Sequence, residues 1–255
     1  MSDPASPLRS ALESGVLTLT LDRPAKRNAL DAATVEALHT ALDRADLDAD
    51  VRVLVLRGAG KDFCAGADLD ELLASADATL ADNEAAALRL GGLFSRMRRL
   101  PKPVLAVVHG RALAGGAGLV TACDLAVAGA GAQLGYPEIL RGFVPAMVMT
   151  LLRRAAGEKV ALDLVLTGRL LTAEEARQAG LISRVVPEAE LDREAGELTL
   201  SLARSSLSAL AFTKQLFYQL DGRSLDDGVA LGARVNALAR QTPDFRAAIA
   251  QFLSR

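Results

Sequence analysis

The sequence predicts an α/β fold that ends in an all-helical region. Short apolar segments typical of strands alternate with helical patterns over residues 1–190, whereas residues 191–255 show helical patterns only. Hydrophobic residues make up 51% of the 255 residues, which is enough for a large buried core. We therefore expect an α/β core of residues 1–190, followed by a helical region of residues 191–255.

The first part of the core has the pattern of a strand, a helix and a second strand. Val16–Leu21 alternates like a strand with one buried face and ends at the turn Asp22-Arg23-Pro24. Asp31 is placed to cap a helix, because apolar residues recur after it at helical spacing. Val51–Leu56 is then expected to form the second strand.

A long helix, a third strand and a glycine-rich segment follow. Leu80–Leu100 has a helical pattern that stops at Pro101-Lys102-Pro103. Val104–Val108 is wholly apolar, as in a strand buried on both faces. The segment Gly110–Ala122 is expected to turn into a short buried helix, and Leu125–Ala128 resumes the strand pattern.

The remainder of the chain is mainly helical. We expect helices at residues 146–155, 158–166 and 173–179, and a last strand at Ile182–Val186. Turn residues interrupt the C-terminal helical pattern at Asp221-Gly222 and at Gln241-Thr242-Pro243.

Charge and cysteine content exclude several classes of function. The net charge of −2 provides no positive field, so we expect no nucleic-acid partner and no membrane partner. Cys64 and Cys123 form neither a CxxC pair nor a Cys/His cluster, so no metal site is expected. The first ten residues lack the apolar run of a secretory signal, which favours a cytoplasmic protein.

Several short motifs follow one another in a fixed order along most of the chain. They are Asp22-Arg23-Pro24 with Asn28-Ala29-Leu30, Phe63-Cys64-Ala65-Gly66-Ala67-Asp68-Leu69, Gly110-Arg111-Ala112-Leu113-Ala114-Gly115-Gly116, Cys123-Asp124-Leu125, Leu134-Gly135-Tyr136-Pro137-Glu138, Leu166-Thr167-Gly168 and Ala176 to Val186. With this ordered set, the chain resembles the enoyl-CoA hydratase/isomerase, or crotonase, family from about Leu12 to Leu253.

The resemblance implies a particular architecture and partner. Members of the family form a spiral of repeated ββα units with a helical C-terminal region that mediates trimers, often paired into hexamers. We therefore expect a homotrimer or hexamer assembled through residues 191–255. The expected partner is an acyl-CoA thioester, in which coenzyme A is part of the substrate, so no separate cofactor is expected.

Two loops of small residues match the oxyanion hole of this family. Each loop alone is more typical of a tight turn or of close helix packing, but the two together favour an oxyanion hole, because glycine and alanine permit the close approach that backbone donors require. By resemblance, the donors are the N–H groups of Ala67 and Gly115. Ala65, Gly66 and Gly116 are expected to contact the substrate.

One carboxylate is expected to move the proton. Hydratases of this family commonly use two glutamates; the second corresponds to Glu138, whereas Gly118 occupies the position of the first. A carboxylate with small and apolar neighbours can have a raised pKa suited to acid/base chemistry. We assign catalysis to Glu138 and expect Gly118 to lie beside the substrate.

Further substrate contacts follow from the same resemblance. Lys26 and Arg27 lie where the family contacts the nucleotide end of coenzyme A, although a solvated surface role is equally compatible with either residue. Leu69 is expected to contact the substrate. Phe252 and Arg255 match an aromatic and a basic residue that the C-terminal helix can contribute to coenzyme A binding.

Four other polar residues are given no catalytic role. Asp68 is expected to cap a helix that begins at Leu69, and Asp124 is expected to be a buried hydrogen-bonding residue. His39 and His109 have no Ser, Cys or Asp partner in a recognisable triad.

Three functions are compatible with these residues. Hydration of a 2-enoyl-CoA is preferred, because the stretch Gly142–Ala146 also occurs in hydratase-like members that carry a glycine at the position of Gly118. A Δ3,Δ2-enoyl-CoA isomerase is the alternative, since it needs only one base at the Glu138 position. A non-catalytic acyl-CoA-binding protein would keep both loops, but the presence of Glu138 argues against it.

Overall fold

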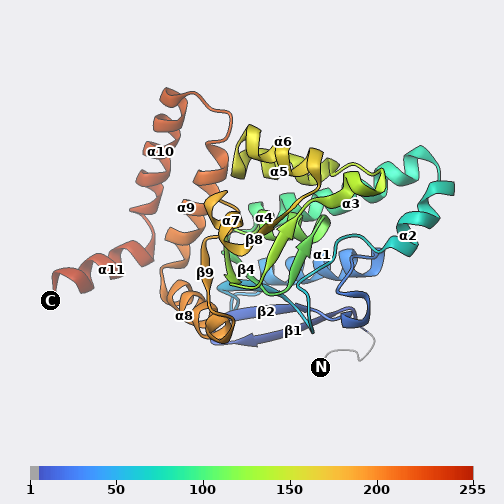
Figure 1. Ribbon diagram of the computed structural model, residues 1–255. Helices are drawn as coiled ribbons and strands as arrows, with labels where there is room; N and C mark the ends of the chain where they lie inside the picture. Colours follow the sequence, from blue (N-terminus) through green and yellow to red (C-terminus); the bar gives the residue numbers. More distant parts are fainter. Residues whose placement is uncertain (1–5, 255) are drawn as a thin grey trace.

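The computed structural model describes residues 6–254 and contains two β-sheets covered by helices (Figure 1). The larger sheet has six strands in the order β1-β2-β3-β4-β6-β9, and the smaller has three in the order β5-β7-β8. In the larger sheet every neighbouring pair is parallel except β1 and β2. The predicted α/β fold with C-terminal helices is therefore confirmed.

The strands are β1 Leu8–Glu13, β2 Val16–Leu21, β3 Val53–Gly58, β4 Val104–Val108, β5 Arg111–Leu113, β6 Leu125–Gly129, β7 Gln133–Gly135, β8 Leu170–Thr172 and β9 Arg184–Val186. The α-helices are α1 Ala32–Leu47, α2 Leu69–Ala74, α3 Leu80–Arg99, α4 Gly115–Ala122, α5 Ala146–Ala156, α6 Glu158–Thr167, α7 Ala173–Gln178, α8 Leu191–Arg204, α9 Leu207–Gln219, α10 Leu225–Ala239 and α11 Pro243–Leu253.

Strand β4 shows how the large sheet becomes the middle layer of the core. All five of its residues are buried, as its wholly apolar sequence predicts. Leu105 and Val107 belong to a cluster with Leu191 of α8 on one face. Val104, Ala106 and Val108 belong to the main core, which also contains residues of α1, α3 and α4. Side-chain alternation along the strand thus separates two helical layers.

Four strands were not predicted, and each lacks a strong strand pattern. In β1 only Leu8 is buried, so its apolar residues do not mark a buried face. Strands β5, β7 and β8 have three residues each, which is too short for a periodic signal. The predicted break points in the C-terminal helices are confirmed, and an additional break separates α8 from α9 at Ser205 and Ser206.

The described helices and the Cys, His and acidic side chains bear on membrane, metal and thiol chemistry. Among residues 6–254, no helix is both long and apolar enough to cross a membrane. The same residues contain no group of three or more His, Cys, Asp or Glu side chains that could hold a metal ion. Cys64 and Cys123 are both buried free thiols, as predicted.

A buried ion pair joins the C-terminal helices to the core. Lys214 of α9 is 8% exposed, and its Nζ atom lies 2.7 Å from Asp124 Oδ2. Lys214 also donates to the carbonyls of Met97 and Lys102, at 2.8 and 2.9 Å. Asp124 additionally accepts a hydrogen bond from the N–H of Val104 at 2.7 Å. The predicted buried hydrogen-bonding role of Asp124 is therefore confirmed.

We predict that Lys214→Met lowers the free energy of unfolding by about 3–5 kcal/mol, because it leaves the Asp124 carboxylate buried without its cation. Urea unfolding followed by circular dichroism measures this change. Lys159→Met is the matched control, since Lys159 is exposed on α6 and makes no ion pair among the described residues. Equal unfolding midpoints for the two variants would contradict the assigned role.

Candidate active site

The first loop of the candidate site, residues 63–68, follows the turn after β3. Backbone hydrogen bonds hold it on two sides. The N–H of Cys64 donates to the carbonyl of Arg111 at 3.0 Å, and the N–H of Leu30 donates to the carbonyl of Gly66 at 2.8 Å. The loop is therefore held in place by its own chain, without a bound ligand.

The second loop joins β5 to α4 and touches the first loop at Gly66. The N–H of Ala114 donates to the carbonyl of Gly135 in β7 at 2.8 Å, and α4 begins at the next residue, Gly115. A β-carbon on Gly66 would lie 2.7 Å from Ala114 Cβ and 3.5 Å from the Gly115 nitrogen. Since the φ of Gly66 is also +95°, only glycine is suited to this contact.

Two backbone N–H groups lie beside this contact. Within residues 6–254, the N–H groups of Ala67 and Gly115 donate to no protein acceptor. Gly115 is buried and opens α4, so its N–H group lies at the positive end of the helix dipole. Two such donors can stabilise an oxygen atom that gains negative charge during a reaction.

Backbone strain occurs directly before the Gly115 donor. Ala114 has a φ of 51° and a ψ of −120°, a conformation that is usual for glycine and unfavourable for alanine. A residue in such a region typically costs about 1–3 kcal/mol. The turn into α4 is thus maintained by its surroundings and not by the preference of Ala114.

Glu138 lies in the 3₁₀ helix Pro137–Arg141, which follows β7. Strands β5 and β7 are parallel neighbours, so this 3₁₀ helix and the beginning of α4 leave the same edge of the small sheet. Glu138 is 8% exposed, and its Oε2 atom is buried without a hydrogen-bond partner among residues 6–254. Burial raises the pKa of Glu138, as expected for an acid/base residue.

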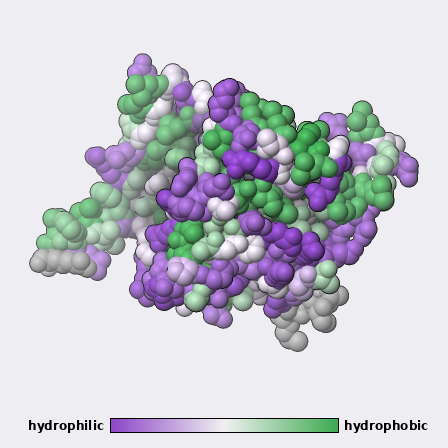
Figure 2. All heavy atoms as spheres, in the orientation of Figure 1, coloured by the Kyte–Doolittle hydropathy of each residue, from purple (hydrophilic) through white to green (hydrophobic). Residues whose placement is uncertain are grey.

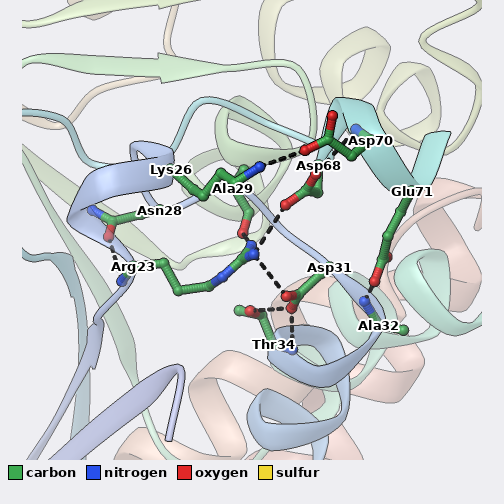
Figure 3. A network of polar contacts seen from close by, with 10 residues as sticks. All are labelled: Arg23, Lys26, Asn28, Ala29, Asp31, Ala32, Thr34, Asp68, Asp70 and Glu71. Carbon is green, nitrogen blue, oxygen red and sulfur yellow. Dashed lines mark hydrogen bonds and ion pairs between the residues drawn. The ribbon is translucent and has the colours of Figure 1, made fainter. Parts of the chain in front are cut away.

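Arg23 connects the first loop to the beginning of α1 (Figure 3). Its guanidinium group lies 2.9 Å from both Asp31 and Asp68 and donates to the carbonyl of Ala29 at 2.5 Å. Asp31 caps α1 and Asp68 caps α2, as predicted. The hydrogen bond from Arg23 holds the pKa of Asp68 below its usual value. This network fixes the segment that follows Ala67.

Asn28 fixes the other side of the first loop. Its side chain is 1% exposed, and its Oδ1 atom accepts from the N–H of Arg23 at 3.0 Å. Its Nδ2 group donates to the carbonyls of Ala59, Asp62 and Phe63. Arg23 and Asn28 belong to the sequence motifs, but no role was predicted for either residue. Their position beside the turn at Pro24 is the one local signal of a structural role. Their hydrogen-bond partners are distant in sequence, so the role itself has no local signal.

Lys26 and Arg27, the two basic residues predicted to contact coenzyme A, lie on the exposed segment before Asn28. Lys26 pairs with Asp70 at the start of α2, and this hydrogen bond raises the pKa of Lys26 (Figure 3). Arg27 forms no ion pair among the described residues, and its carbonyl accepts the N–H of Ala65 at 3.0 Å. Arg27 thus positions the first loop through its backbone. Contacts of both side chains with coenzyme A stay predictions.

The glycines of α4 permit close packing. A β-carbon on Gly116 would lie 2.4 Å from the carbonyl oxygen of Cys64, so Gly116 lets α4 approach the first loop. A β-carbon on Gly118 would lie 2.5 Å from Val148 and 2.7 Å from Phe94. Side chains of α3 and α5 therefore fill the space that a glutamate side chain at position 118 would enter. Substrate contacts at both glycines stay predictions.

The remaining predicted contacts lie far apart. Leu69 opens α2 next to the first loop and is 57% exposed. Phe252 is 73% exposed on α11, which projects from the opposite side of the molecule to α2 (Figure 1). One chain therefore does not bring Phe252 to the two loops. Arg255 lies outside the described residues.

We predict that Ala114→Gly raises the free energy of unfolding by about 1 kcal/mol, because glycine relieves the strain at positive φ. Thermal and urea unfolding measure this effect. Ala117→Gly is the matched control: Ala117 lies inside α4, where the same change is expected to destabilise by about 1 kcal/mol. Destabilisation by both variants to the same extent would show that the turn at Ala114 is not strained.

Comparison with known proteins places this geometry in a family. Residues 11–255 match the family model described as enoyl-CoA hydratase/isomerase. A Thermus thermophilus protein named as a candidate enoyl-CoA hydratase is 42% identical, over 94% of this chain and 95% of its own length. The 2,3-dehydroadipyl-CoA hydratase of Escherichia coli is 38% identical, over 94% and 92% of the two chains.

Solved structures agree with the sequence comparisons. A crystal structure of an enoyl-CoA hydratase from Mycobacterium smegmatis has a TM-score of 0.93 at 34% identity and covers 97% of this chain and 96% of its own. The residues that match the family model include both predicted loops and Glu138. The chain belongs to the enoyl-CoA hydratase/isomerase family.

Proposed function

We propose that this protein is an enoyl-CoA hydratase that adds water across the 2,3 double bond of an acyl-CoA thioester. The observation that carries this proposal is the buried, unpartnered Oε2 atom of Glu138 at the edge of the sheet where the Ala67 and Gly115 N–H groups are also free. Hydratase is also the activity in the names of the relatives from Escherichia coli and Mycobacterium smegmatis.

In the proposed reaction the thioester oxygen accepts hydrogen bonds from Ala67 and Gly115. These bonds draw electrons from the conjugated double bond and make C3 electrophilic. Glu138 removes a proton from water as the water oxygen forms a bond to C3, and the electron pair of the double bond moves to the enolate oxygen. The protonated Glu138 then gives a proton to C2, which restores the carboxylate and completes the addition.

The packing at Gly118 restricts the acid/base chemistry to one carboxylate. A glutamate at this position would need Val148 and Phe94 to move, since its β-carbon would overlap both side chains. Gly118→Glu is therefore expected to disrupt the packing of α4 and not to increase hydration. Glu138 must serve first as base and then as acid.

Two other functions make different predictions for the same site. A Δ3,Δ2-isomerase also needs one carboxylate, but it moves a proton between C2 and C4 without adding water. A binding protein would retain thioester affinity without turnover. Crotonyl-CoA and a 3-enoyl-CoA distinguish the three: hydration of crotonyl-CoA with slow 3-enoyl isomerisation supports the proposal, and the reverse rates would identify an isomerase.

We further propose that copies of the chain assemble into trimers or hexamers through the C-terminal helices. Helices α10 and α11 project from the core, and apolar atoms lie on their exposed surface (Figures 1 and 2). The exposed apolar residues include Leu225, Val229, Phe245 and Ile249. Such a surface is typical of an interface. In an oligomer, Phe252 of one copy can approach the site of its neighbour.

A cytoplasmic location is part of the same proposal. Cys64 and Cys123 are buried and unpaired, which suits a reducing compartment. Burial raises the pKa of Cys64 to about 12, so its thiol stays protonated and unreactive beside the first loop.

We predict that Glu138→Gln lowers kcat for crotonyl-CoA by about 10²–10⁴-fold and leaves thioester affinity within a few-fold, because it removes the acid/base but keeps the shape. Loss of the enoyl-thioester absorbance measures turnover. Glu158→Gln, on the exposed start of α6, is the matched control and should retain activity. A fully active Glu138→Gln enzyme would exclude Glu138 from catalysis.

The pH dependence provides an independent prediction. Glu138 must be ionised to accept the proton from water, so kcat/KM should rise with pH through the pKa of this residue. Because burial raises that pKa, the midpoint should lie above the usual range of glutamate. A rate profile with its midpoint at the usual value, or the same rise in Glu138→Gln, would contradict the assignment.

A further inference from the structure

A cavity of about 480 Å³ lies at the C-terminal end of α4, the end opposite to Gly115. Its walls come from α3, α4, α5 and α9 and from the segment after α7. Polar groups come from Arg98, Asp124, Arg154, Ser183, Tyr218 and Asp221. Ala67, Gly115 and Glu138 do not line it, and α4 is about 12 Å long. The cavity is therefore separate from the candidate active site.

Most charges in the cavity wall are already paired. Arg154 forms an ion pair with Asp221. Asp124 is neutralised by Lys214 at 2.7 Å and accepts a further hydrogen bond from the hydroxyl of Tyr218 at 2.8 Å. These two acids therefore leave no negative charge for another cation in the wall.

Arg98 is the exception. Among residues 6–254 no carboxylate forms an ion pair with it, and its Nε atom is buried without a hydrogen-bond partner. Its one hydrogen bond runs from Nη2 to the carbonyl of Thr121, at 3.2 Å. A buried donor without an acceptor is costly, and the cost is greater when the group is charged. The cavity wall thus contains one uncompensated positive charge.

Aromatic packing holds this guanidinium group in place. Arg98 Cζ lies 4.8 Å from the ring centre of Tyr218, and the ring of Phe217 meets that of Tyr218 edge-on at 5.4 Å. The Tyr218 ring covers one face of the Arg98 guanidinium group. A ligand would therefore accept hydrogen bonds from the N–H groups at the edge of the guanidinium plane. A carboxylate matches that edge better than other anions do, because it can accept two parallel hydrogen bonds.

We propose that this cavity binds a small organic monocarboxylate. The carboxylate accepts hydrogen bonds from Arg98, and the apolar part of the ligand packs against Val120, Leu181 and Phe217. A neutral ligand would leave Arg98 uncompensated. A dianion such as phosphate would exceed the one free positive charge. The volume is in the range of small-molecule sites.

The test is a calorimetric titration of the full-length protein with hexanoate. Hexanamide has nearly the same shape without the charge and is the ligand control. We expect hexanoate to bind in the millimolar range or tighter, with hexanamide at least tenfold weaker. Butyryl-CoA at saturation should leave hexanoate affinity unchanged, because the coenzyme A thioester is expected at the other end of α4.

Variants separate the cavity from the rest of the surface. Arg98→Met should weaken hexanoate at least tenfold, whereas Arg99→Met, a change of the exposed neighbouring arginine, should leave its affinity unchanged. Phe217→Ala should weaken hexanoate too. Since the Phe217 side chain is 70% exposed, this variant is expected to fold even if Arg98→Met does not. Circular dichroism of each variant establishes its fold.

Several results would overturn the proposal. Three concern the unmodified protein: no hexanoate binding, equal binding of hexanamide, or competition by butyryl-CoA. The fourth is an unchanged hexanoate affinity in folded Arg98→Met or, if that variant does not fold, in Phe217→Ala. Sedimentation of the Arg98→Met variant tests a different occupant of the cavity. If the unmodified protein does not bind hexanoate and the variant has a changed oligomeric state, a second copy of the chain covers the cavity and the proposal is wrong.

Discussion

The close approach of two backbones at Gly66 is the contact on which the site depends. A single added carbon there would lie 2.7 Å from Ala114, so any side chain would push the two loops apart. Separate parts of the fold maintain the contact: the Arg23 and Asn28 hydrogen bonds hold the first loop, and the β5–β7 pairing holds the turn into α4. The free N–H groups of Ala67 and Gly115 are a consequence of this arrangement.

The packing of α4 also explains which acid the site contains. Gly116 and Gly118 let the helix lie against the first loop, α3 and α5, so α4 is buried along its whole length. At Gly118 a glutamate would overlap Val148 and Phe94 unless both side chains moved. The acid comes instead from the 3₁₀ helix after β7, where burial of Glu138 without a partner for Oε2 raises its pKa. Both the packing of α4 and the raised pKa therefore indicate Glu138 as the acid/base residue.

The sequence predicted the long elements and the glycine loops because both leave local signals. Helices α1 and α3 and strands β2 and β4 have clear periodicity or length, and glycine marks close approach. The three-residue strands of the small sheet leave no such signal. The roles of Arg23 and Asn28 depend on partners about 30–45 residues away, and the overlap at Gly118 depends on α3 and α5. Neither could be inferred without the fold.

In the proposed reaction backbone N–H groups polarise the thioester carbonyl, and infrared spectroscopy of bound butyryl-CoA labelled with ¹³C at that carbonyl measures this polarisation. Hydrogen bonds to the oxygen weaken the C=O bond, so the stretching frequency should fall well below its value in water. Gly115→Pro deletes one donor and, in protein that circular dichroism shows to be folded, should reverse much of this fall, whereas Gly115→Ala keeps the donor and should preserve it. A bound carbonyl with the frequency found in water, or equal frequencies in the two variants, would contradict the account.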